Sequence, residues 1–185
     1  MRRRELLAGG ASVGALGVAG AIAVRGLPVG DEPGEAADGG GSDPAPVEIE
    51  TIDAPGSRAG TIELPTTGEP TFVDFFGTWC PPCEKQMPAL VEAHERLGDE
   101  VRFVSVTTED VGGSVSEQHV VDWWNEHDGN WAVGVDPTAE LWARYATGFP
   151  YAVAIDASGT VQWSEGGAKT TDEFVAGIER ALDDE

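Results

Sequence analysis

Seven short segments of the chain carry the hydrophobic patterns of β-strands. Residues 47–50 and 60–64 alternate apolar with polar positions, which predicts two half-exposed strands that pair as an N-terminal hairpin. Residues 71–76 are apolar on both faces apart from Asp74, a pattern typical of a central strand that is covered on both sides. The remaining expected strands are residues 101–106, 131–133, 151–155 and 160–163, the last two forming a hairpin.

Helices are predicted between and after these strands. The first runs over residues 81–97, because apolar side chains recur there with helical spacing and Gly98 follows as a stop signal. A second helix is expected to begin at a capping box made by Ser114 and Glu117 and to end near residue 127.

Two more helices complete the pattern. Asp136 and Pro137 open a short helix, since proline suits the first helical position, and Thr170 and Glu173 form the capping box of the last helix. This order of elements predicts an α/β fold in which a central mixed β-sheet is flanked by helices and preceded by the N-terminal β-hairpin. We expect one such domain over residues 47–185.

The composition is strongly acidic. Asp and Glu number 33 against 11 Lys and Arg, which gives a formal net charge of -22 over 185 residues. Binding to phosphate backbones or anionic lipid headgroups depends on clustered Lys and Arg, so the charge argues against nucleic acid and membrane surfaces as partners. We interpret the acid excess as a solvated, halophilic surface; the alternative is an acidic face for a basic partner.

The N-terminal residues differ chemically from the rest of the chain. Residues 1–25 begin with three Arg after the first Met, followed by 19 uncharged residues of which 11 are Gly or Ala. This is the pattern of an export signal or N-terminal membrane anchor, and residues 3–7 resemble the twin-arginine motif. Residues 26–46 are rich in Gly, Pro and acidic side chains and predict a flexible linker. We therefore expect the domain outside the cytoplasm, secreted or anchored to the cytoplasmic membrane through its N-terminal segment only.

The two cysteines of the chain form one candidate redox pair. Cys80 and Cys83 lie three positions apart at the predicted junction of the central strand and the first helix. One helical turn brings such a pair into bonding distance, and the free N–H groups at a helix start stabilise a thiolate on the first cysteine. We expect Cys80 to attack a substrate disulfide and Cys83 to resolve the mixed disulfide. Pro81 and Pro82 withhold two N–H donors and stiffen this turn.

Two other interpretations of the pair stay open. One is an inert structural disulfide. The other is half of a metal site, which is weakened because the chain has no second cysteine pair. A binding module that carries Cu(I) or another thiophilic metal on the two sulfurs belongs to this second class.

Several segments resemble the thioredoxin superfamily. Residues 73–83, which end in Trp-Cys-Pro-Pro-Cys, are similar to its active-site segment, and residues 87–90 resemble its TlpA-like extracytoplasmic branch. Residues 148–151 are similar to the family's cis-proline loop, and residues 156–159 to the hairpin that follows. The resemblance covers about residues 47–185 and implies a thioredoxin-like fold.

The resemblance implies a substrate-binding surface around the cysteines. Pro150 would be in the cis form and pack against the pair, and the backbone of Phe149 would pair with the bound substrate chain. Trp79 would shield the site and contact substrate, with simple core packing as the alternative. Pro81 and Pro82 belong to the same expected surface.

Asp74 falls at the position of the family's buried acid, which moves a proton to or from Cys83. A charged, unpaired carboxylate in a strand buried on both sides costs on the order of several kcal/mol. We therefore expect Asp74 to be protonated or reached by water. The alternative is a structural acid whose hydrogen bonds are satisfied.

Together these features predict a thiol-disulfide oxidoreductase that acts on protein disulfides outside the cytoplasm, and the resemblance to the TlpA-like branch implies that it acts as a reductase. The only redox group is expected to be the Cys80–Cys83 disulfide, with no further cofactor and no metal. The expected partners are protein thiol or disulfide substrates and a membrane electron-donor protein. We expect a monomer that binds no nucleic acid.

Overall fold

The structure is a computed structural model that describes residues 45–183. The expected leader, residues 1–25, and nearly all of the expected linker, residues 26–46, lie outside the described residues. Within residues 45–183, no helix is long and apolar enough to cross a membrane. The expectations of export and anchoring therefore stay predictions.

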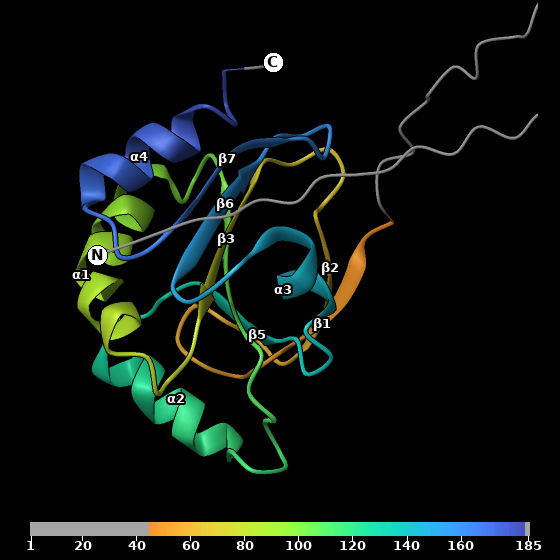
Figure 1. Cartoon of the computed structure of the whole chain (residues 1–185), viewed down its shortest axis with the longest axis vertical. Coiled ribbons are helices and arrows are strands. Elements are labelled where there is room, and N and C mark those ends of the chain that lie inside the picture. The colour runs from red at the N-terminus through yellow and green to blue at the C-terminus, as the bar shows by residue number, and fades with distance from the viewer. Residues whose placement is uncertain (1–44, 184–185) are drawn as a thin grey trace, which may run out of the picture. The chain divides into compact units, whose positions relative to one another are not determined.

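Seven strands form one mixed β-sheet in the described part of the chain (Figure 1). They are β1 (Val47–Thr51), β2 (Gly60–Leu64), β3 (Thr71–Phe76), β4 (Arg102–Thr107), β5 (Ala132–Val135), β6 (Tyr151–Ile155) and β7 (Val161–Gly166). Their order across the sheet is β2-β1-β5-β4-β3-β6-β7. β3 is parallel to β4 and antiparallel to β6, while β1 and β2 form the expected N-terminal hairpin.

Helices cover both faces of this sheet. They are α1 (Pro81–Leu97), α2 (Glu117–Glu126), α3 (Glu140–Tyr145) and α4 (Thr171–Glu179). One apolar core joins side chains of α1, α2 and α4 to one face, and a second core joins Leu141 of α3 to the other face. Figure 1 shows α1 and α4 together on one side of the sheet and α3 on the opposite side. The predicted mixed α/β architecture is confirmed.

Every residue of β3 is buried, as its two-sided apolar pattern predicts. Phe72 and Phe76 belong to the core beneath α1, whereas Val73 and Phe75 belong to the core on the α3 side. Side chains of a strand alternate between faces, so Asp74 lies on the α1 side together with the two Phe rings. The strand that ends next to the cysteines thus carries a carboxyl group into the core.

The start of α2 differs from the prediction. Its N-cap is Ser116, whose Oγ accepts the N–H of His119 at 3.1 Å, and the capping box expected from Ser114 and Glu117 is wrong. Ser114 lies earlier, in a loop where its backbone N–H donates to the Asp110 carboxylate at 3.0 Å. Asp110 accepts the backbone N–H of Ser114 and so keeps this residue in the loop, and Ser116 caps the helix instead.

The start of α3 also differs from the prediction. The helix begins at Glu140, three residues after Pro137. The buried carboxylate of Asp136 accepts the backbone N–H groups of Glu140 and Trp142, both at 2.9 Å, so it caps the helix from four residues away. The capping box expected for α4 is present.

A tight turn around Gly56 packs against the loop that precedes β5. The turn is closed by the N–H of Ser57, which donates to the carbonyl oxygen of Ala54 at 2.9 Å. Gly56 has a φ of +71°, and a Cβ added there would lie 2.0 Å from the carbonyl carbon of Asn130. This position therefore needs glycine both for its backbone conformation and for the space.

We predict that Gly56→Ala lowers the free energy of unfolding far more than Gly68→Ala. Gly68 has a similar φ of +83° but no atom within 4 Å of an added Cβ, so its substitution carries only the left-handed strain of about 1–2 kcal/mol. Urea unfolding of the two variants measures the difference, which reports the clash with Asn130. Equal losses in both variants would show that the turn moves away from the β5 loop at no cost.

Candidate active site

The two cysteines form a disulfide at the start of α1. The S–S distance between Cys80 and Cys83 is 2.08 Å and their Cα atoms lie 5.3 Å apart. Cys80 is the N-cap of α1, and its own N–H donates to the carbonyl oxygen of Gly77 at 3.0 Å. Both cysteines are buried, Cys83 slightly more than Cys80. The expected roles of Cys80 as the attacking cysteine and Cys83 as the resolving cysteine stay predictions.

The first turn of α1 offers few hydrogen-bond donors to Cys80. Pro81 and Pro82 occupy its first two positions and have no N–H group. The backbone N–H of Cys83 donates to the Sγ of Cys80 at 3.3 Å. A thiolate on Cys80 is therefore stabilised by this N–H and by the positive end of the helix dipole.

Exposed side chains surround the disulfide. Trp79 is 64% exposed, and Pro81 and Pro82 are exposed as well. The ring of Trp79 meets the ring of Phe149 edge-on, with their centroids 5.7 Å apart. The Phe149–Pro150 peptide bond is cis, as the resemblance implies. The exposure of Trp79 favours substrate contact over core packing for this residue.

Strand pairing brings the cis-proline loop to the cysteines. Tyr151, the first residue of β6, pairs with Phe75 near the end of β3. Pro150 therefore lies at the end of the sheet where the chain passes from β3 into the cysteine segment. Segments some 70 residues apart in sequence thus form one edge of the site.

Asp74 is buried beneath this site and accepts one hydrogen bond on each carboxylate oxygen. Gln86 donates from Nε2 to Oδ1 at 2.8 Å, and Ser105 donates from Oγ to Oδ2 at 3.3 Å. The Ser105 hydroxyl in turn accepts the indole N–H of Trp131 at 2.9 Å. Gln86 lies one helical turn after Cys83, so this network connects the acid to the helix that carries the pair.

Burial raises the pKa of Asp74 to about 7, although the hydrogen bonds from Ser105 and Gln86 act in the opposite direction. The removal of the carboxylate from water is the larger effect, because Asp74 is only 1% exposed. Its two neutral donors reduce the cost of the charged form without cancelling it. Asp74 can therefore both hold and release a proton close to neutral pH.

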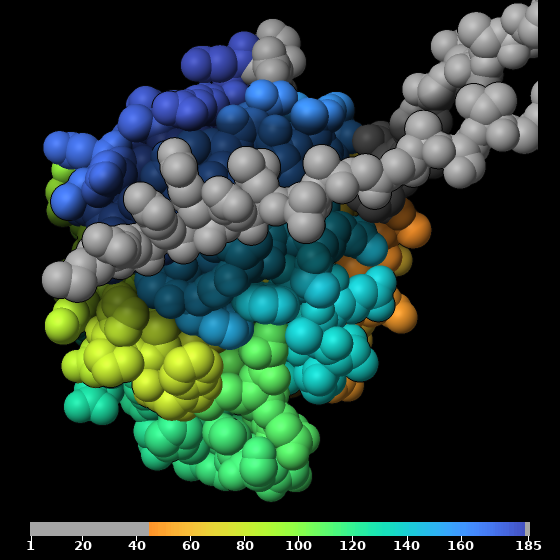
Figure 2. All heavy atoms as spheres, viewed as in Figure 1, coloured from red at the N-terminus to blue at the C-terminus, as the bar shows by residue number. Residues whose placement is uncertain are grey.

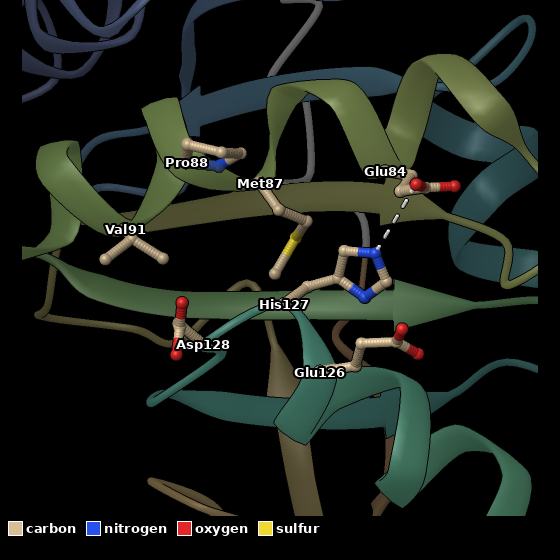
Figure 3. A pocket seen from close by; sticks show the side chains of 7 residues that line it. All are labelled: Glu84, Met87, Pro88, Val91, Glu126, His127 and Asp128. Atoms are coloured by element: carbon tan, nitrogen blue, oxygen red, sulfur yellow. Dashed lines mark ion pairs between the residues drawn. The ribbon is translucent and has the colours of Figure 1, made fainter.

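A groove lies beside the active-site helix, between α1 and the end of α2 (Figure 3). It has a volume of about 410 Å³. Its lining is apolar along α1 and acidic at the rim, and consists of Glu84, Met87, Pro88, Val91, Glu126, His127 and Asp128. His127 donates from Nδ1 to the carbonyl oxygen of Trp123 at 2.7 Å, which turns its Nε2 toward the Glu84 carboxylate at 3.9 Å. Residues 45–183 include no group of three or more His, Cys, Asp or Glu side chains placed to hold a metal ion.

Sequence reasoning did not single out the polar partners of the site. Gln86 and Ser105, which bind Asp74, are among them, and so are Thr78, Glu109 and His119 in front of the cysteines. One signal was available for Glu109: it follows the end of a parallel strand, where functional groups gather in α/β sheets. The spacing of Gln86, three residues after Cys83, was another.

We predict that the stability of Asp74→Asn relative to the wild type increases from acid to alkaline pH. The pKa of folded Asp74 lies above its ordinary value of 3.8, so its contribution to stability is complete below about pH 4 and is lost as the pH rises to about 7. Asparagine cannot ionise, and the free energy of unfolding of the variant relative to wild type should rise over this range by at most roughly 4 kcal/mol. Urea unfolding between pH 4 and pH 8.5 tests this, and subtraction of the wild type removes the effect of the other carboxylates. A constant difference across the range would contradict the raised pKa.

Comparison with known proteins agrees with this geometry. A sequence model of the Redoxin family matches residues 42–182. Thioredoxin Y, a chloroplastic protein of Oryza sativa subsp. japonica, is 44% identical over 46 residues, 25% of this chain and 27% of that protein. Thiol-disulfide oxidoreductase ResA of Bacillus cereus is 28% identical over 96 residues, 51% of this chain and 53% of that protein. The chain thus spans about a quarter and about half of the length of these two relatives.

Solved structures support the same assignment at the level of the fold. The crystal structure of StoA from Bacillus subtilis superposes with a TM-score of 0.59 at 24% sequence identity, over 72% of this chain and 96% of that one. The family match covers most of the chain, including β3, the cysteine pair and the cis-proline loop. The chain therefore belongs to the Redoxin family and has a thioredoxin-like fold.

Proposed function

We propose that this protein is a thiol-disulfide oxidoreductase that reduces protein disulfides outside the cytoplasm. The observation that carries the proposal is the Cys80–Cys83 disulfide at the start of α1, beside the exposed Trp79 and the cis-proline loop. Membership of the Redoxin family and the likeness to a protein named thiol-disulfide oxidoreductase support the same class of reaction.

The first step forms a mixed disulfide. In the reduced protein, the Cys80 thiolate attacks one sulfur of the substrate disulfide. The substrate S–S bond breaks, a bond forms between Cys80 Sγ and that sulfur, and the other substrate sulfur leaves as a thiolate that takes up a proton. The N–H of Cys83 and the dipole of α1 stabilise the attacking thiolate.

The second step releases the substrate. The Cys83 thiolate attacks Cys80 Sγ, the mixed disulfide breaks, and the Cys80–Cys83 disulfide forms while the substrate leaves as a dithiol. Asp74 receives the proton of the Cys83 thiol in this step, which its pKa of about 7 allows at neutral pH. In sum, the cysteine pair gives two electrons to the substrate. The Cys80 proton has gone to solvent and the Cys83 proton to Asp74, and the two substrate thiolates take up two protons from solvent.

The composition of the CPPC turn supports the reducing direction. Many donors to the first cysteine stabilise its thiolate, favour the dithiol form and make a couple oxidising. Here Pro82, at the second helical position, removes one of the two N–H groups that bond an N-cap side chain, and the N–H of Cys83 is the donor that remains. The dithiol form is then less favoured, and the pair gives its electrons away more readily.

A reductase of this kind needs a supply of electrons and a location. We propose that the domain lies outside the cytoplasm, either secreted or anchored to the membrane by the N-terminal segment. It acts as a monomer, and the dithiol of a membrane electron-donor protein reduces it again. Support comes from the basic and then apolar pattern of residues 1–25 and from the acidic, Gly-rich and Pro-rich residues 26–46. Protein thiols and disulfides are the proposed substrates.

Serine substitutions test the roles of the two cysteines. Cys83→Ser should accumulate a mixed disulfide with a disulfide-containing protein such as insulin, because Cys80 can attack but nothing resolves the product. Cys80→Ser should form no adduct and show no turnover. Non-reducing gel electrophoresis and an insulin-reduction assay measure both effects, with the double variant as control. Full activity in either single variant would contradict the mechanism.

The reduction potential tests the direction of electron flow. Equilibration with reference thiol-disulfide couples in high salt should give a value near or below about -270 mV, as for a reductant. A value near about -120 mV would make the protein an oxidant that installs disulfides. Absence of a reversible couple, together with one equivalent of bound Cu(I), would favour the metal-binding alternative.

A further inference from the structure

The segment in front of Cys80 is a tight turn over residues 77–80. Its closing hydrogen bond runs from the N–H of Cys80 to the carbonyl oxygen of Gly77 at 3.0 Å, which leaves Thr78 and Trp79 as the two central residues. A Cβ at Gly77 would lie 2.8 Å from Nε1 of Trp79, so the indole ring lies back across the turn. Its edge then meets Phe149 on the other side. The position of Trp79 is thus set by the turn and by Phe149.

A carboxylate from the neighbouring strand holds this turn. Glu109, two residues after the end of β4, accepts the backbone N–H of Thr78 at 2.9 Å and the Thr78 hydroxyl at 2.7 Å. A third donor, the hydroxyl of Thr107, reaches the same carboxylate at 2.9 Å. Figure 2 shows the two segments side by side at the surface, the turn before α1 in yellow and the loop after β4 in green.

A histidine completes the arrangement. Nε2 of His119, in the first turn of α2, lies 3.1 Å from the Thr78 hydroxyl oxygen. The single hydroxyl proton of Thr78 is already directed to Glu109, so His119 is the donor in this contact. The Thr78 side chain is therefore bound from both sides, by an acceptor that follows β4 and by a donor on α2.

We propose that Glu109 and Thr78 form a positioning clamp that fixes Trp79 for the binding of protein substrates. Neither residue touches the reacting sulfurs in this role. The clamp holds the exposed indole in place before substrate arrives, so that a polypeptide around a disulfide meets a surface that is already ordered. A small disulfide reaches Cys80 without using this surface. The inference rests on the proposed function. It assigns to Thr78 and Glu109 a preference of the enzyme for disulfides in polypeptides over small disulfides.

The substitution Thr78→Val tests the clamp with little change in side-chain volume. It removes the hydroxyl contacts with Glu109 and His119 but keeps the backbone N–H bond. With insulin as substrate, KM should rise by about tenfold and kcat should change little, since the loss is that of a charge-assisted hydrogen bond used for binding. With glutathione disulfide as substrate, both constants should stay close to those of the wild type.

Matched variants separate positioning from general damage. Thr78→Ser keeps the hydroxyl and should have the wild-type KM for insulin. Thr108→Val is the matched control, because it makes the same chemical change at a neighbouring half-buried position outside the clamp. Glu109→Ala should raise KM at least as far as Thr78→Val. The double variant Thr78→Val/Glu109→Ala should raise KM by less than the product of the two single effects, because both changes break the bond between the Thr78 hydroxyl and Glu109. Equal losses on insulin and glutathione disulfide, or no loss on insulin, would overturn the proposal.

A spectroscopic measurement tests the clamp independently of turnover. In protein labelled with 5-fluorotryptophan, Trp79→Phe identifies the fluorine resonance of Trp79. That resonance should shift or broaden in Thr78→Val and keep its wild-type position in Thr78→Ser. If the wild type reduced neither substrate, the proposed function would be wrong. The fluorine resonance would still show whether Thr78 fixes the position of Trp79. An unchanged Trp79 resonance in Thr78→Val would refute the clamp.

Discussion

β3 lies between a parallel strand, β4, and an antiparallel strand, β6, and this pairing brings the parts of the active site together at one end of the sheet. β3 and β4 are parallel and end together, and β6 is antiparallel and begins at the same place. Cys80 follows β3, Glu109 follows β4, and Pro150 precedes β6. The three segments therefore keep their mutual positions only as long as β3 stays packed on both faces. Its complete burial is the condition on which the geometry of the site depends.

The same strand carries the one group that opposes its burial. Asp74 lies between Phe72 and Phe76 in sequence and is as buried as they are. Burial raises its pKa to about 7, so its ionisation lowers the free energy of unfolding as the pH rises toward neutral. Gln86 and Ser105 limit this cost by donating one hydrogen bond to each carboxylate oxygen. An apolar residue would pack there without such a conflict. The proposed role of Asp74 as proton acceptor for Cys83 gives a reason why the chain keeps an acid in its core.

The parts of the fold that follow local rules could be predicted from the sequence, and the contacts of the site could not. β3 and α1 have the expected bounds because a two-sided apolar run and a proline start leave few alternatives. The start of α2 was misplaced because Ser114 and Ser116 are equally good caps, and the choice depends on Asp110. The bonds from Thr78 to Glu109 join residues 31 apart, and the bond from Gln86 to Asp74 joins residues 12 apart. Such pairs are set by strand register and side-chain direction, which no local pattern encodes.

The chain enters the domain at a point that is held from two sides. β1 pairs with β5 through Glu50 and Thr51, which lie opposite Val135 and Gly134 at the end of the sheet where β3, β4 and β5 finish. Two residues before β1, the carbonyl oxygen of Ala45 accepts a hydrogen bond from Arg144 of α3 at 2.6 Å. A pull on the preceding chain therefore acts on α3 and on the β1–β5 pairing before it reaches β3, the strand that leads into the cysteines.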